Sequence, residues 1–280
     1  MSKIRAETPQ GREISRPWTK PLHSIHIPAI AMQHHTIELL LLISGCSVAL
    51  TALPAQTQPS TAFEIGTTLT TSNVQGNART IKILDADVVL NASGYETVLH
   101  TVAYQNSEQL WQPLCNPNVE EDTRAVALPG QWDSTGSYLD NNEITFACTS
   151  GVIGKCVLWG YHPQQTVEGY SLQDLHQACT RMARADYCGD GVSHTRDGTE
   201  IDIYDRLSIQ MPTTHSAMAF EAAWGPDGAV WISRTRWPEA ITYVHANCPE
   251  RLQAEGLSPE EIQARLPNAL IFNDSFVRSR

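Results

Sequence analysis

The chain has 280 residues and carries 30 acidic against 19 basic side chains, which gives a formal net charge of −11 at pH 7. Nucleic acid is therefore a poor partner, because phosphate contacts need clustered lysine and arginine, and the one basic cluster here is dilute and N-terminal. A hydrophobic content of 41% allows a core of ordinary size. The length suits one folded domain with appendages, or two small domains.

The N-terminal segment has the pattern of an export signal preceded by an extension. Residues 1–31 are rich in Pro, Arg, Lys and His and have no usable periodicity, so we interpret them as an extension before a true start at Met32. We interpret residues 32–45 as a lipoprotein-type signal peptide. Their apolar run, residues 37–43, is far shorter than the roughly 20 residues that span a bilayer. The alternative interpretation is a buried apolar helix.

The sequence ISGC, residues 43–46, resembles the bacterial lipobox. The resemblance implies cleavage before Cys46, attachment of diacylglycerol to its thiol, and firm anchoring by two or three acyl chains. Two features depart from the pattern. Glu38 interrupts the apolar run, and residues 32–36 contain neither Lys nor Arg.

Residues 46–62 carry no charge and contain small residues, Pro and Thr, which is typical of a flexible lipidated tether. Ser47 follows the cysteine, and the absence of Asp at this position favours the outer membrane if the cell is a diderm bacterium. We therefore expect an exported protein whose membrane contact is made by its N-terminal acyl chains. The sequence identifies no protein or glycan partner.

The remaining cysteines predict disulfides. If Cys46 is lipidated, six of the seven cysteines are left, and an even number in an exported domain predicts three disulfides. These are Cys115, Cys148, Cys156, Cys179, Cys188 and Cys248. Six cysteines permit about 15 pairings, and the sequence does not choose among them. Zinc is the competing interpretation, but the chain contains no C-x-x-C pair.

The folded unit, residues 63–280, begins with a β-rich part, residues 63–144. Short runs rich in Val, Ile, Thr and Tyr alternate with turn residues, and we predict strands at 80–84, 87–92, 96–105, 108–115 and 143–148. Two glycines then separate Cys148 from Cys156. This stretch is either a hairpin closed by a disulfide or a turn whose two cysteines bond to different elements.

Residues 171–187 predict the one main amphipathic helix. Ser171 is a good N-cap, and Leu172, Leu175, Cys179 and Met182 form one apolar stripe. Gly189 is expected to end the helix.

The C-terminal part predicts further strands and one short helix. A strand is expected at 201–210, a hairpin at 220–237 around the turn Gly225–Gly228, and a last strand at 269–276. Residues 258–261, SPEE, form a capping box with Pro at the first helical position. The expected fold is α+β, mostly antiparallel β with one main amphipathic helix, and stabilised by disulfides.

The run ADYCGDG, residues 185–191, together with residues 146–163 and 220–237, resembles the signature of the ADYC domain family. The motif residues are Ala185, Asp186, Tyr187, Cys188, Gly189, Asp190 and Gly191. The resemblance places this domain at residues 145–280, with the β-rich part in the same folded unit. It implies an exported bacterial protein, often a lipoprotein, and it assigns no activity.

The acidic loop after the helix, residues 186–205, contains the candidate catalytic residues Asp190, His194 and Asp197. Carboxylates and a histidine can act as general acid and base, and carboxylates suit Ca²⁺. However, the chain lacks the EF-hand spacing, H-E-x-x-H, G-x-S-x-G and a P-loop. Asp and Gly are also turn formers, and Asp side chains accept hydrogen bonds from local N–H groups. A dyad of Cys188 and His194 would need a free thiol.

We favour a non-enzymatic binding or envelope-structural role without a metal or other cofactor. The alternative is an exported hydrolase or a metal-binding protein that uses the acidic loop, with Ca²⁺ or another divalent cation. Asp186 lies on the apolar side of the predicted helix and, if it is buried, needs a partner such as Arg181 or Arg184. Four scattered histidines are interpreted as surface or hydrogen-bonded residues: His162, His176, His215 and His245.

Overall fold

A computed structural model describes residues 62–278, apart from residues 73–77, 119, 134, 214–216 and 254–255. The predicted extension, the signal peptide, Cys46 and the tether up to residue 61 lie outside the described residues, as does His215. Among the described helices, none combines the length and the apolar character that crossing a bilayer requires.

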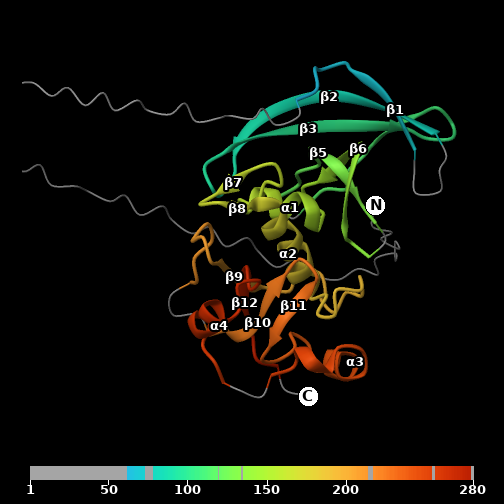
Figure 1. Cartoon of the computed structure of the whole chain (residues 1–280). Coiled ribbons are helices and arrows are strands. Elements are labelled where there is room, and N and C mark those ends of the chain that lie inside the picture. Colours follow the sequence, from blue (N-terminus) through green and yellow to red (C-terminus); the bar gives the residue numbers. More distant parts are fainter. Residues whose placement is uncertain are drawn as a thin grey trace, which may run out of the picture. The chain divides into compact units, whose positions relative to one another are not determined.

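The described chain forms two main antiparallel sheets, a small hairpin and short helices (Figure 1). The strands are β1 (Thr68–Ser72), β2 (Ala78–Leu90), β3 (Glu96–Gln105), β4 (Trp111–Pro113), β5 (Ala125–Trp132), β6 (Tyr138–Cys148), β7 (Thr166–Val167), β8 (Tyr170–Ser171), β9 (Ile201–Asp205), β10 (Ala219–Gly225), β11 (Gly228–Ile232) and β12 (Ile271–Ser275). The helices are α1 (Val152–Leu158), α2 (Leu172–Arg184), α3 (Ala240–Asn247) and α4 (Pro259–Arg265), with a 3₁₀ turn η1 (Pro249–Arg251).

The N-terminal sheet has the strand order β1-β2-β3-β5-β6, with β4 paired to β3, and the C-terminal sheet has the order β11-β10-β12-β9. Strands β7 and β8 form a separate antiparallel hairpin. The 13-residue helix α2 is the longest helix described, and it lies between the two sheets (Figure 1). The predicted class, mostly antiparallel α+β with one main helix, is therefore confirmed.

The stretch between Cys148 and Cys156 forms helix α1 and not a hairpin. Its two cysteines bond to different elements, because Cys148 pairs with Cys115 and Cys156 pairs with Cys179. The glycine inside this helix, Gly154, is explained by a close backbone contact and not by a hairpin turn. A Cβ atom at Gly154 would lie 2.4 Å from the Cys148 carbonyl oxygen, so this close approach requires glycine inside the helix.

Helix α2 begins as predicted, since the Ser171 side chain accepts a hydrogen bond from the backbone N–H of Gln173. The prediction that Gly189 ends the helix was wrong. The helix ends at Ala185, which adopts the left-handed conformation with φ 50° and ψ 42°. A non-glycine residue in this region is uncommon, and the small methyl group of Ala185 is fully buried.

The C-terminal sheet contains the predicted hairpin, formed by β10 and β11. The predicted last strand is β12, and it lies centrally between β10 and β9. The strand expected at residues 201–210 is shorter and ends at Asp205, because that carboxylate accepts hydrogen bonds from three backbone N–H groups of residues 207–210. Ser258 and Glu261 form the predicted capping box of α4.

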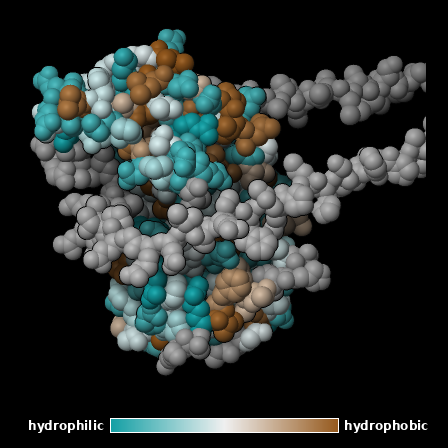
Figure 2. Space-filling model, turned by 180° about the vertical axis from the view of Figure 1, so that it is seen from behind, coloured by the Kyte–Doolittle hydropathy of each residue, from teal (hydrophilic) through white to brown (hydrophobic). Residues whose placement is uncertain are grey.

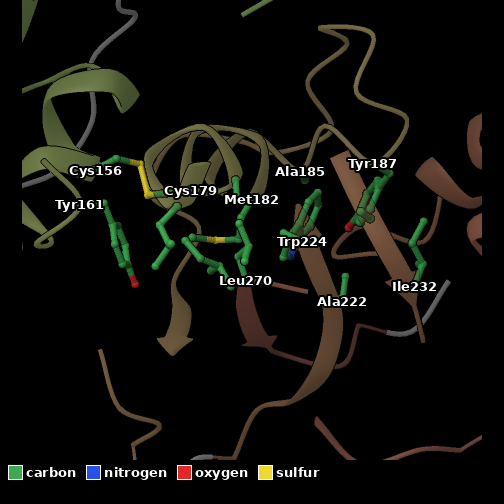
Figure 3. Packing of buried hydrophobic residues seen from close by; sticks show 14 of the residues in the cluster. Cys156, Tyr161, Cys179, Met182, Ala185, Tyr187, Ala222, Trp224, Ile232 and Leu270 are labelled. Atoms are coloured by element: carbon green, nitrogen blue, oxygen red, sulfur yellow. A yellow bond between two sulfur atoms is a disulfide. The ribbon is translucent and has the colours of Figure 1, made fainter. Parts of the chain in front are cut away.

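The largest core lies between α2 and the C-terminal sheet (Figure 3). The stripe residues Leu172, Leu175, Cys179 and Met182 are all buried in it, as the periodicity predicts. Below the end of α2, the ring of Tyr187 stacks on that of Trp224, with centroids 5.3 Å apart. The N-terminal sheet packs one face on α1 in a second core.

The other face of the N-terminal sheet is partly exposed. Val88 and Leu90 on β2 are 62% and 68% exposed, and Ile144 on β6 is 37% exposed. Figure 2 shows apolar residues among hydrophilic ones over its upper part, where Figure 1 places β1 to β3. The described residues therefore leave part of the apolar surface of this sheet uncovered.

Two histidines are buried near the junction of the helices and the N-terminal sheet. His176 on α2 packs against Trp132 of β5, and its Nε2 atom lies 3.0 Å from the Ile153 carbonyl oxygen. His162 follows α1. Burial lowers the pKa of each to about 4. His245, in contrast, is exposed.

The disulfide pairing generates the first prediction. Alkylation of the denatured protein should find no free thiol from Cys115 to Cys248, and replacing both Cys156 and Cys179 by Ala should lower the free energy of unfolding by about 2–4 kcal/mol. The unfolded chain would regain the freedom of the closed loop. Intact-mass analysis, peptide mapping and urea unfolding measure these outcomes. A peptide that links Cys148 to Cys156 would contradict the pairing.

The buried histidines generate the second prediction. Between pH 6.5 and pH 4 the unfolded chain binds protons that the folded protein does not, so stability falls as the pH is lowered through this range and is fully present above it. We expect a loss of about 1–2 kcal/mol per histidine from pH 7 to pH 5. Urea unfolding should show a smaller loss in His176→Gln and an unchanged loss in His245→Gln. Equal pH dependence in the two variants would refute this assignment.

Candidate functional site

Ala185 and Asp186, the first two residues of the ADYCGDG motif, reverse the chain direction at the end of α2. The backbone N–H of Ala185 donates to the Met182 carbonyl, and that of Asp186 donates to the Arg181 carbonyl. This left-handed turn satisfies two of the carbonyls that a helix end leaves unpaired. It also turns the Asp186 side chain back towards the helix.

Asp186 is fully buried and forms an ion pair with Arg181, at 2.6 Å between Oδ2 and Nη1. The same carboxylate oxygen accepts a hydrogen bond from the Gly191 backbone N–H. The requirement for a buried partner is therefore confirmed, and the partner is Arg181. Arg184 instead donates to the carbonyl oxygens of Thr135 and Gly191.

Tyr187 connects the motif to a second buried ion pair. Its hydroxyl donates to Glu221 Oε1 at 3.0 Å and accepts from the Arg236 backbone N–H at 2.7 Å. The Arg236 guanidinium pairs with the Glu221 carboxylate and donates to the carbonyl oxygens of Met182 and Ala183 at the end of α2. Burial, and next the charge of Glu221, hold the pKa of Tyr187 well above 10, so the hydroxyl remains a donor.

Both motif glycines occupy positions that exclude a side chain. Gly189 has φ +74°, and a Cβ atom there would lie 1.9 Å from the Asp227 carbonyl oxygen. Gly191 has φ +86°, and its Cβ would lie 2.5 Å from the Thr135 Cα. Between them and the helix, Cys188 forms a disulfide with Cys248. The thiol required for a Cys188/His194 dyad is therefore absent.

Asp190 and His194 both contact Tyr243 of α3. Asp190 accepts a hydrogen bond from the Tyr243 hydroxyl at 2.6 Å and another from the Val192 backbone N–H. Burial opposes ionisation of Asp190, but these hydrogen bonds outweigh it and lower its pKa. The His194 ring lies against those of Tyr187 and Tyr243, and burial lowers its pKa although Asp190 and Asp186 oppose this.

Asp197 does not join this cluster. It is exposed, and no hydrogen bond or ion pair connects it to Asp190 or His194 within the described residues. Of the other loop carboxylates, Asp202 accepts from the backbone N–H and hydroxyl of Thr213, and Asp205 accepts from the turn that follows β9 and from the Tyr161 hydroxyl. Over the described ranges, no three His, Cys, Asp or Glu side chains converge in a way that could hold a metal ion.

Three residues of this arrangement were not found by sequence reasoning. Glu221 and Arg236 lie inside the predicted hairpin, and nothing in an alternating strand pattern marks a buried ion pair. Tyr243 lies on a helix with a weak apolar pattern. Only the tertiary contacts with the acidic loop reveal their roles.

The sequence model of the ADYC domain family matches residues 63–238 of this chain. The protein therefore belongs to the ADYC domain family. The match includes the β-rich part that the sequence analysis separated from the domain, and it ends just before α3. Searches of the curated proteins and of the solved structures find no significant match.

The buried pair of Arg181 and Asp186 generates the third prediction. Asp186→Asn leaves a buried guanidinium without its counter-charge and should lower the free energy of unfolding by about 3–5 kcal/mol. Asp197→Asn makes the same chemical change at an exposed position and should alter it by less than about 0.5 kcal/mol. Chemical denaturation monitored by tryptophan fluorescence tests both. Similar losses in the two variants would show that the motif carboxylate is not a structural centre.

Proposed function

We propose that this protein is an exported bacterial lipoprotein with a non-enzymatic binding or envelope-structural role, and that a diderm cell places it at the outer membrane. The observation that carries the proposal is the pairing of the cysteines. All six cysteines from Cys115 onwards form disulfides, which persist in oxidising compartments outside the cytosol. Cys46 is left over, and it lies in the lipobox-like sequence.

The chemistry of the acidic loop supports a non-enzymatic role. Asp186 is committed to Arg181, Asp190 to Tyr243, and Cys188 to a disulfide. The buried ion pair commits Asp186, and the disulfide removes the Cys188 thiol from nucleophilic attack, while the hydrogen bond of Asp190 holds the loop against α3. The loop thus supports a rigid display domain better than a hydrolase.

The uncharged tether supports anchoring at a distance from the bilayer. A flexible chain of the length of residues 46–62 has a root-mean-square end-to-end distance of about 20–25 Å. The folded unit would then reach partners beyond the lipid headgroups while the acyl chains remain in the membrane.

The anchor generates the fourth prediction. In the full chain expressed in a bacterial host, Cys46→Ser should abolish incorporation of labelled palmitate and release the protein from the membrane fraction, because the acceptor thiol is lost. Ser44→Ala keeps a small residue in the lipobox-like sequence and should retain both the label and the fractionation. Membrane association that survives Cys46→Ser would overturn the lipoprotein proposal.

A further inference from the structure

A groove with a volume of about 740 Å³ lies beside the acidic loop. Its walls come from that loop through Arg196, from the residues before and within α3, and from the segment after β12 through Arg278. Ligand sites commonly have volumes of roughly 300–1,000 Å³ and combine apolar surface with a few polar groups. This groove has that composition, since Trp237, Ile241 and Val277 line it together with the two arginines.

The groove carries an uncompensated positive charge. The Arg196 guanidinium carbon lies 3.7 Å from the centroid of the Trp237 ring, and that of Arg278 lies 4.0 Å from it. Arg196 is also paired with Glu239, whereas Arg278 forms no ion pair with any residue that the structure describes. The groove is therefore lined by two arginines and one glutamate, and this local excess of positive charge favours an anion although the whole chain has a net charge of −11.

Contacts of the acidic loop with α3 fix two of the three walls of the groove relative to each other. The acidic loop is joined to α3 by the hydrogen bond between Asp190 and Tyr243, by the contact of the His194 and Tyr243 rings, and by the disulfide from Cys188 to Cys248. A site whose walls are held before binding loses less conformational entropy when a ligand enters. The loop therefore acts here as the support of a site and not as the site itself.

We propose that the groove binds a small organic anion that has a carboxylate or phosphate next to a flat apolar body. The oxyanion would pair with the Arg278 guanidinium, whose planar array of N–H donors matches such groups. The flat body would pack against the apolar side chains of Ile241 and Val277, because the two arginines already cover the Trp237 ring. This proposal specifies the ligand of the proposed binding role, and it does not depend on the lipid anchor.

Isothermal titration calorimetry of the full-length protein tests the proposal with simple probes. Phenyl phosphate should bind saturably with a Kd of about 1 mM or below. Inorganic phosphate lacks the flat body and benzyl alcohol lacks the charge, so each should bind at least about tenfold more weakly. Benzoate carries a carboxylate in place of the phosphate and so tests which charged group the groove prefers. Saturable binding of benzoate, of phenyl phosphate or of both supports the proposal.

Matched variants locate the binding. Arg278→Gln should weaken phenyl phosphate binding by about tenfold or more, because a charge-assisted hydrogen bond is lost. Lys155→Gln removes a positive charge from an exposed position on α1, away from the groove, and should leave binding unchanged. Near-ultraviolet circular dichroism checks that both variants are folded. The proposal is overturned if neither phenyl phosphate nor benzoate binds, if phosphate or benzyl alcohol alone binds as tightly, or if Arg278→Gln binds like the wild type. Failure here leaves the membrane fractionation of Cys46→Ser untouched, so the two proposals fail separately.

Discussion

The guanidinium of Arg181 is the group on which the arrangement of this domain depends. From the last turn of α2 it donates to the Thr135 carbonyl and Ser137 hydroxyl in the β5–β6 connection, to the Pro226 carbonyl in the β10–β11 turn, and to Asp186. One buried cation thus joins both sheets to the motif. Because it is only 2% exposed, every donor needs a protein partner, and this restricts the segments that can surround it.

The motif of the family has a physical explanation in these contacts. Ala185 fits a buried left-handed turn, Asp186 neutralises Arg181, and Tyr187 fills the space over Trp224 while donating to Glu221. The glycines that follow permit close approach of other backbone segments. Arg236, which is paired with Glu221, donates to the carbonyl oxygens of Met182 and Ala183 and so places a positive charge at the negative C-terminal end of α2. The motif therefore encodes a folded junction.

Local signals made part of this structure predictable. The caps at Ser171 and Ser258, the apolar stripe of α2 and the β10–β11 hairpin depend on neighbouring residues, and all were found in the structure. The even number of cysteines predicted three disulfides but not their partners, because pairing depends on tertiary distance. Helix α1 was missed because Gly154 is required by contact with Cys148, which no local pattern reveals. The groove joins residues as distant in sequence as Arg196 and Arg278, so only the fold brings them together.

The three disulfides have an order that bears on how the chain matures. Cys115 bonds to Cys148, Cys156 to Cys179, and Cys188 to Cys248, so each cysteine bonds to the next one along the chain. A chain that crosses a membrane from its N-terminus and is oxidised as it emerges would form these bonds in sequence, without reshuffling. Cys46 would disturb that order by pairing with Cys115. The acylation proposed for the Cys46 thiol would prevent this pairing, because an acylated sulfur cannot form a disulfide with Cys115.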